Sequence, residues 1–280
     1  MTEFAERYGP WALISGASEG VGSSFAHRIA AEGVNCILVA RREGPLQSLA
    51  DALREQHGVE VVTASIDLAA ADAPDRICEV AGDREVGLFI NNAGSDTNSA
   101  RFLDKPLADW EQLVDRNVMT VMRCCHHFAG PMRTRGRGGI ILVGSGAGYG
   151  GASFMAAYAG TKAFTICFGE GLWAELRPHG VDVLNLVLSR TDTPVHRANL
   201  ERRGLPVPPG LASPDDVARV GLERLSLGPI HNWNEPDDQP GMSASSAAAR
   251  REKILFIDSR TANAFGGGAK PAPAAKETAA

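Results

Sequence analysis

The sequence predicts a doubly wound α/β domain built on a mainly parallel sheet. Short apolar runs alternate along the chain with segments of helical periodicity, and no internal repeat interrupts this alternation. The runs are continuously apolar, which is typical of strands covered by helices on both faces. A chain of 280 residues, 44% of them hydrophobic, can bury one substantial core.

The expected strands are apolar runs bounded by glycine, asparagine or charged residues. Six such runs are residues 11–15, 34–40, 59–66, 86–90, 140–143 and 181–188, and residues 254–257 are the candidate for a last strand. Apolar residues at helical spacing predict helices over residues 21–31, 46–56, 74–80, most of 107–132, and 156–176. Another helix is expected to begin at Ser213, because a serine followed by proline and two acids is typical of a helix N-terminus.

One domain is expected over residues 1–265. Within it, the proline-rich and charged residues 195–212 are interpreted as a loop or substrate lid, and residues 228–265 as a C-terminal extension that faces the substrate or another subunit. Residues 266–280 consist mainly of glycine, alanine, proline and lysine, so we expect a disordered tail.

Composition excludes several classes of function. The net charge of −5 gives no basic face for nucleic acid, and no run of 18 apolar residues predicts a membrane span. The polar N-terminus lacks a signal sequence, and five cysteines without a Cys-x-x-Cys pair suggest free thiols, so a cytoplasmic location is expected. The run Cys124 to His127 predicts no metal site, because successive helical residues point about 100° apart.

A glycine-rich segment follows the first expected strand. Gly16, Gly20 and Gly22 are spaced as Gly-x-x-x-Gly-x-Gly, immediately before a helix. A pyrophosphate binds at a helix N-terminus where glycines let it approach the backbone N–H groups. The segment therefore predicts a dinucleotide site, with a flexible turn as the alternative interpretation.

The second expected strand ends in Ala40, followed by Arg41 and Arg42. Sites that prefer NAD place a carboxylate here to hold the ribose 2′-hydroxyl, whereas arginine binds a 2′-phosphate with paired hydrogen bonds. Two cations and no acid predict NADP(H). The alternative is a solvated basic turn.

Tyr158 and Lys162 lie four residues apart on an expected helix and therefore share a face. A nearby ammonium lowers the pKa of a tyrosine from about 10, which would make the phenol useful as an acid/base. Ser145 ends the fifth expected strand, at the sheet edge where doubly wound folds bind ligands. Each feature alone is weak, since an aromatic core residue or a turn serine would explain it.

Together and in this order, these motifs resemble the short-chain dehydrogenase/reductase family over residues 10 to about 225. The resemblance implies a single Rossmann-type domain with a seven-stranded sheet, and a homodimer or homotetramer with contacts from the helices around 110–130 and 158–176. It implies a catalytic tetrad of Asn117, Ser145, Tyr158 and Lys162. Asn117 would hold a proton-relay water, and Lys162 would also hold the nicotinamide ribose.

The resemblance also implies the cofactor contacts. Residues 67–68 match the family's adenine-contacting pair, and residues 91–94 match its Asn-Asn-Ala-Gly signature. Residues 188–189 replace the usual Pro-Gly, and the terminal Asp-Gly-Gly signature is absent. The full expected cofactor set is Gly16, Ser18, Glu19, Gly20, Val21, Gly22, Arg41, Arg42, Asp67, Leu68, Asn92, Ala93, Gly94, Tyr158, Lys162, Ser189, Thr191 and Thr193.

A narrower resemblance is to bacterial NADP-dependent 7β-hydroxysteroid dehydrogenases. It is carried by residues 8–11, 19–22, 39–42 and 125–127. The expected activity is interconversion of a secondary alcohol and a ketone on a small molecule, either steroid-like or another bulky cyclic compound. A reductase of 3-oxoacyl thioesters or of general ketones and aldehydes, a non-catalytic NADP-binding sensor or scaffold, and a sugar-nucleotide epimerase remain alternatives. The short chain and the glycine spacing count against the epimerase.

Overall fold

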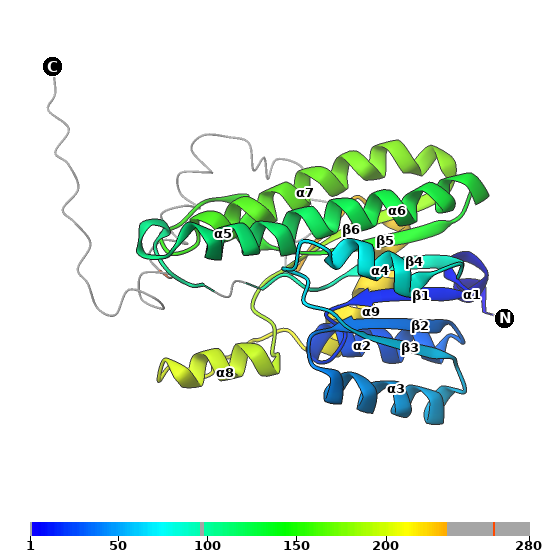
Figure 1. Ribbon diagram of the computed structural model, residues 1–280, viewed down its shortest axis with the longest axis horizontal. Helices are drawn as coiled ribbons and strands as arrows, with labels where there is room; N and C mark the ends of the chain where they lie inside the picture. Colours follow the sequence, from blue (N-terminus) through cyan, green and yellow to red (C-terminus); the bar gives the residue numbers. More distant parts are fainter. Residues whose placement is uncertain (1, 96–97, 234–259, 261–280) are drawn as a thin grey trace, which may run out of the picture.

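The computed structural model describes residues 2–95, 98–233 and 260, and shows a sheet covered by helices on both faces (Figure 1). The sheet has seven strands in the order β3-β2-β1-β4-β5-β6-β7, and every neighbouring pair is parallel. The predicted Rossmann-type fold class is confirmed. The strands are β1 (Trp11–Ser15), β2 (Asn35–Ala40), β3 (Val61–Ser65), β4 (Val86–Asn91), β5 (Gly138–Ser145), β6 (Val181–Leu188) and β7 (Ile230–Asn232).

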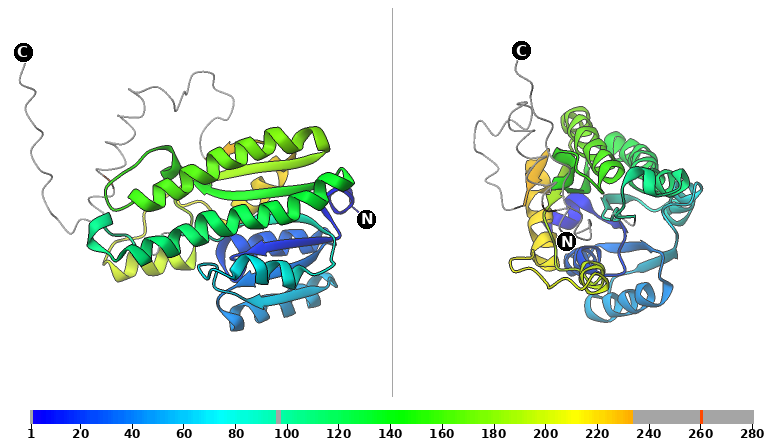
Figure 2. Two further views of the ribbon diagram at one scale, coloured as in Figure 1. Left: turned by 45° about the horizontal axis from the view of Figure 1, so that its top comes forward. Right: turned by 90° about the vertical axis from the view of Figure 1, so that its left-hand side faces the viewer.

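Burial explains why the strands lack an alternating pattern. Every residue of β1 and β4 is buried, because helices pack on both sides of the central strands. One core lies beneath α2 (Gly20–Ala31), α3 (Glu43–His57) and α9 (Pro214–Arg224). The opposite core lies beneath α4 (Ala73–Ala81), α6 (Thr120–Arg135) and α7 (Ala156–Leu176). Figure 2 shows the two helical layers from further directions.

The strand order reverses between β1 and β4. The chain runs from β1 outward through β2 and β3, and then returns to place β4 on the other side of β1. Ser15 and Asn91, the last residues of β1 and β4, are paired in register, and the Ser15 hydroxyl donates a hydrogen bond of 3.0 Å to Asn91 Oδ1. In doubly wound folds this switch point opens a crevice at the carboxyl ends of the strands.

Three elements differ from the sequence-based expectations. A short helix, α1 (Glu3–Tyr8), precedes β1 where only a polar N-terminus was expected. The expected lid, residues 195–212, begins with a helix, α8 (Pro194–Arg202), rather than a loop. The seventh strand is β7, within the segment expected to be an extension, and its three half-buried residues give almost no apolar signal. The candidate strand 254–257 and the tail 266–280 lie outside the described residues.

The long expected helix over 107–132 consists of three parts. These are α5 (Leu107–Val114), a π-helical turn (Asp115–Met119) and α6. Insertions of π-helix are often found at functional sites, and this one contains Asn117. Among the described helices, none has the length and apolarity that crossing a bilayer requires.

Candidate active site

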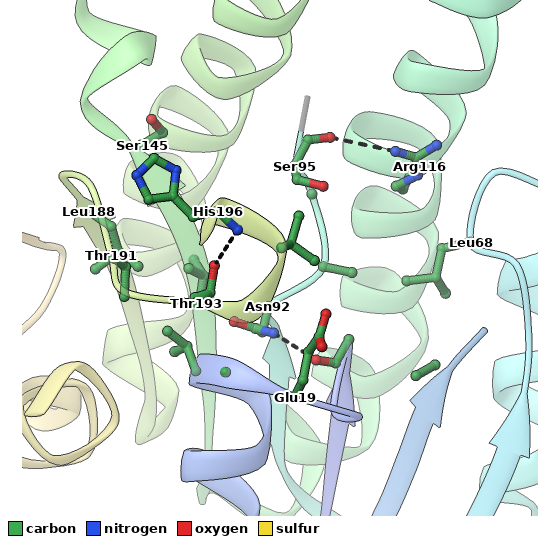
Figure 3. A pocket seen from close by; sticks show the side chains of 18 of the residues that line it. Glu19, Leu68, Asn92, Ser95, Arg116, Ser145, Leu188, Thr191, Thr193 and His196 are labelled. Atoms are coloured by element: carbon green, nitrogen blue, oxygen red, sulfur yellow. Dashed lines mark hydrogen bonds between the residues drawn. The ribbon is translucent and has the colours of Figure 1, made fainter. Parts of the chain in front are cut away.

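A cavity of about 400 Å³ opens at the carboxyl edge of the sheet, at the switch point (Figure 3). Its volume is in the range of small-molecule and cofactor sites. Most residues singled out in the sequence line it: Gly16, Ser18, Glu19, Gly20, Val21, Arg41, Arg42, Asp67, Leu68, Asn92, Ala93, Gly94, Ser145, Tyr158, Lys162, Ser189, Thr191 and Thr193. Gly22 and Asn117 do not line the cavity; both are buried beside it.

The glycine segment forms a tight loop between β1 and α2. A Cβ at Gly22 would lie only 2.2 Å from the Gly16 carbonyl oxygen, so a larger residue would push the loop away from the helix. Asn92 holds the loop from the next strand, because its Nδ2 donates a hydrogen bond of 2.9 Å to the same oxygen. The Glu19 side chain does not cap α2. The first turn of α2 at the cavity wall therefore fits a phosphate group.

The two arginines after β2 also reach the cavity wall, which fits a cofactor with an additional phosphate. Arg42 Nη2 lies 2.6 Å from Glu19 Oε2, in an ion pair that joins this wall to the glycine loop. A guanidinium carries five N–H donors, so this pair leaves other donors for an anion. The sequence did not predict the pairing.

The candidate acid/base group comes from β5 and α7. Ser145 ends β5, and its Oγ accepts a hydrogen bond of 3.2 Å from the Ala147 backbone N–H. On α7, Lys162 Nζ lies 5.9 Å from the centre of the Tyr158 ring and donates a hydrogen bond of 3.1 Å to the Val143 carbonyl. Burial lowers the pKa of Lys162 to about 8. The three side chains that the sequence placed together thus share one cavity.

Asn117 approaches this group from the π-helical turn. Its Nδ2 donates a hydrogen bond of 3.0 Å to Thr161 Oγ1, which in turn donates one of 2.8 Å to the Tyr158 carbonyl. Asn117 Oδ1 is buried and has no hydrogen-bond partner among the described residues. A Cβ at Gly94 would lie 2.7 Å from Lys162 Nζ and 3.2 Å from Asn117 Oδ1. Both polar groups therefore face the same glycine.

The structure adds cavity residues that the sequence did not reveal. Two of them, Val195 and His196, come from α8, and another, Arg116, precedes Asn117 in the π-helical turn. No periodicity or motif marks these positions, because α8 buries none of its residues completely. Val195 and His196 belong to the expected lid, residues 195–212, whereas the approach of Arg116 to the cavity arises only from the tertiary fold.

Three glycines, Gly148, Gly150 and Gly151, follow Ser145 in the sequence. A Cβ at Gly148 would lie 2.8 Å from the Lys162 carbonyl carbon, so this glycine lets the 3-10 turn Gly146–Tyr149 pack directly on α7. None of the residues 146–156 lines the cavity. Gly148 therefore serves close packing against α7.

No cluster of three or more metal-binding side chains occurs within residues 2–95 and 98–233 or at 260. Cys124 and Cys125, in the segment considered above, are both buried in the core beneath α6. Burial raises the pKa of both thiols. Both cysteines therefore serve as apolar core residues.

The fold and the crevice together define a doubly wound α/β protein of the dinucleotide-binding type. The chain belongs to the short chain dehydrogenase family, whose model matches residues 10–204. A 7beta-hydroxysteroid dehydrogenase of Clostridium sardiniense is 33% identical over 222 residues, which are 79% of this chain and 84% of that protein. A very-long-chain 3-oxoacyl-CoA reductase of Laccaria bicolor is 33% identical over 230 residues, which are 81% of this chain and 66% of the relative.

Solved structures give the same assignment. A structure from work on 7beta-hydroxysteroid dehydrogenase stereoselectivity superposes with a TM-score of 0.76 at 29% identity, covering 84% of this chain and 91% of the other. A short-chain dehydrogenase from Sphingobium yanoikuyae in complex with NADPH superposes with a TM-score of 0.71 at 28% identity. The match covers 96% of this chain and 99% of the other. The predicted family is therefore confirmed.

Proposed function

We propose that this protein is an NADP(H)-dependent oxidoreductase that interconverts a secondary alcohol and a ketone, with Tyr158 as the acid/base. The observation that carries the proposal is the arrangement of Tyr158, Lys162 and Ser145 in one cavity, beside a glycine loop and two arginines suited to a phosphorylated dinucleotide. An oxidoreductase that acts on CH–OH groups fits the family to which the chain belongs.

When bound, the nicotinamide supplies the hydride in the reducing direction and accepts it in the other. The Tyr158 hydroxyl donates a proton to the carbonyl oxygen of the substrate, and Ser145 Oγ holds that oxygen in place. The Lys162 ammonium favours the phenolate that remains, because opposite charges attract strongly in a buried site. Asn117 Oδ1, buried and without a partner among the described residues, holds a water that returns a proton to the site.

The preference for NADP(H) is supported by Arg41 and Arg42 at the cavity wall and by the absence of an acid at position 40. The expected cofactor residues listed above would surround the dinucleotide. A relative of similar fold is known in complex with NADPH, which agrees with this choice. A homodimer or homotetramer in the cytoplasm remains our expectation for the assembled enzyme.

For the substrate, we favour a steroid-like or other bulky cyclic ketone, because a 7beta-hydroxysteroid dehydrogenase is among the most similar relatives. Reduction of 3-oxoacyl thioesters is the second candidate, since a very-long-chain 3-oxoacyl-CoA reductase is similarly related. Residues 195–212, beginning in α8, would close over either substrate as a lid.

The test is NADPH oxidation with ketosteroids, simple cyclic ketones, 3-oxoacyl thioesters and aldehydes. We expect turnover that is fastest with bulky cyclic ketones, and a loss of at least about 1,000-fold in Tyr158→Phe with NADPH binding retained. Rapid turnover by Tyr158→Phe would contradict the mechanism. NADPH binding without turnover of any compound by the wild-type protein would instead favour a sensor or scaffold.

A further inference from the structure

His196 is a cavity residue without a role in the proposed reaction. It lies in the first turn of α8, and its imidazole faces the cavity that also contains Ser145 and Leu188 (Figure 3). The Nε2 atom is buried but has no hydrogen-bond partner among the described residues. Burying a polar nitrogen without a partner is unfavourable, so such an atom in a ligand cavity indicates a partner that the ligand supplies.

The backbone around His196 is held in place. Thr193 Oγ1 caps α8 by accepting a hydrogen bond of 3.2 Å from the His196 N–H. Asp192 and Arg197 form a two-pronged ion pair across the same turn, with N–O distances of 2.5 and 2.6 Å. The backbone that carries the imidazole is therefore held by local structure before any ligand arrives.

The base of the lid is also closed. Thr191 pairs with Ala212 in an isolated β-bridge, and two backbone hydrogen bonds of 2.9 and 3.0 Å tie residues 190–192 to Ala212. The two ends of the segment 193–211 are therefore held together. This segment, which contains most of the expected lid, connects β6 to α9, and His196 lies on its helix α8.

The surroundings of His196 favour the neutral imidazole, because they lower its pKa. Burial lowers the pKa of His196, and the nearby Arg190 lowers it further, while Asp192 opposes the shift. A neutral imidazole can donate or accept one hydrogen bond at Nε2, depending on its tautomer. A hydroxyl group can pair with either tautomer, whereas an oxygen without a proton can pair only with the tautomer that carries hydrogen on Nε2.

We propose that His196 is a specificity-determining residue whose Nε2 hydrogen-bonds an oxygen of the substrate away from the reacting carbon. The inference rests on the proposed function and narrows it to bulky cyclic ketones that carry a second oxygen. The phosphate-binding features of the cavity come from the loops after β1 and β2, whereas His196 comes from the lid after β6. The expected cofactor set ends in this segment at Thr193, and His196 lies one helical turn further along, on the lid that we propose closes over the substrate.

The test uses pairs of cyclic ketones that differ by one hydroxyl remote from the ketone, including ketosteroids. We compare kcat/KM in the wild type, His196→Ala, His196→Gln and the control Glu201→Ala, an exposed position on the same helix. His196→Ala should lower kcat/KM by about 10-fold for the hydroxylated member of a responsive pair, the equivalent of one hydrogen bond, and by less than about twofold for its partner. His196→Gln should recover part of the loss, and Glu201→Ala should match the wild type.

A binding measurement accompanies the kinetics. NADPH affinity, followed by fluorescence, should be unchanged in His196→Ala, and ketone binding in a Tyr158→Phe background should show the same dependence on the hydroxyl. An equal loss for both members of every pair, no loss, or weakened NADPH binding would overturn the inference while leaving the proposed function intact. A wild-type protein that reduces none of these ketones overturns both.

Discussion

Lys162 Nζ donates a hydrogen bond of 3.1 Å to the Val143 carbonyl oxygen from a side chain that is only 4% exposed. No carboxylate of the described residues forms an ion pair with this ammonium. Its burial accordingly lowers the pKa to about 8. A buried cation with so little compensation destabilises the fold, which is typical of a group retained for function.

Lys162→Met should therefore stabilise the protein without its cofactor. The pKa falls from about 10.4 in the unfolded chain to about 8 in the fold, which corresponds to a burial cost of about 3 kcal/mol at neutral pH. The substitution also leaves the Val143 carbonyl without its hydrogen-bond donor, which offsets about 1–3 kcal/mol of the stability gained by removing the ammonium. We expect a net gain of about 1 kcal/mol and a Tm higher by about 2–4 °C at pH 7.

The pH dependence supplies the check. Between pH 8 and 10.4 the unfolded chain binds more protons at Lys162 than the folded chain, so this group makes wild-type stability rise with pH. The advantage of Lys162→Met should accordingly shrink over this interval, disappear at about pH 9 and become a disadvantage by about pH 10. Thermal unfolding of both proteins from pH 6 to 10 measures this difference in stability. A variant less stable than the wild type at pH 7 would contradict the destabilising effect of the buried ammonium. Turnover should be lost at every pH.

Gly94→Ala should damage the site more than the fold. The new methyl group would lie 2.7 Å from Lys162 Nζ and 3.2 Å from Asn117 Oδ1, and the φ of +149° is unfavourable for a side chain. Since the flexible lysine can move aside, we expect a folded protein with kcat/KM lowered by about 10–100-fold. Steady-state kinetics and circular dichroism together test this, with the open position Gly44→Ala as the control. A variant with unchanged kcat/KM would show that Gly94 does not position these groups.

The sequence predicted most of the fold because the strands and their covering helices are strongly patterned. Residues 11–15, 156–176 and 181–188 form the expected elements with the expected bounds. Most of the candidate site could be predicted for a related reason. Parallel strands end at one edge of the sheet, so residues after separate strands necessarily meet there.

The remaining features depend on tertiary contacts that leave no local pattern. Helix α8 buries no residue completely and has few large apolar residues, so its helical character and His196 could not be recognised from apolar spacing. The Glu19–Arg42 ion pair joins two loops that are far apart in sequence. The packing role of Gly148 depends on the approach of α7, which leaves no local pattern in the sequence.

Two glycines of α7 should respond to alanine in opposite directions. A Cβ at Gly169 would lie 2.4 Å from Asn185 Oδ1, in a part of the core where Asn185 is fully buried, whereas Gly171 has open space. Gly171→Ala should stabilise the chain by about 0.5–1 kcal/mol through helix propensity. Gly169→Ala should destabilise it by about 1–3 kcal/mol through overpacking. Urea unfolding of both variants tests this, and equal effects would contradict the packing described for Gly169.

Arg42→Ala should weaken NADPH binding while leaving NADH binding nearly unchanged. A charge-assisted hydrogen bond to the 2′-phosphate contributes about 1.5–3 kcal/mol, so the Kd for NADPH should rise by about 10–100-fold. Arg41→Ala should act in the same direction, since Arg41 also lines the cavity. Fluorescence titrations with both dinucleotides measure the effect. Parallel losses for NADPH and NADH would mean that the arginines do not read the 2′-phosphate.

Glu19→Gln should strengthen the preference for a nucleotide that carries a 2′-phosphate. Glu19 Oε2 lies 2.6 Å from Arg42 Nη2, so its negative charge stands beside the position we assign to the 2′-phosphate. Glutamine keeps an acceptor for the guanidinium but removes the charge, so phosphate repulsion falls while Arg42 stays oriented. We expect adenosine 2′,5′-bisphosphate to bind several-fold more tightly than to the wild type, with adenosine 5′-monophosphate unchanged. Because the pair is half exposed, the gain should diminish as salt rises from 0.01 to 1 M. Calorimetric titration measures the affinity of both proteins for the two nucleotides. Weaker binding of the bisphosphate by Glu19→Gln would show that the Glu19 charge assists Arg42 and does not compete with the phosphate.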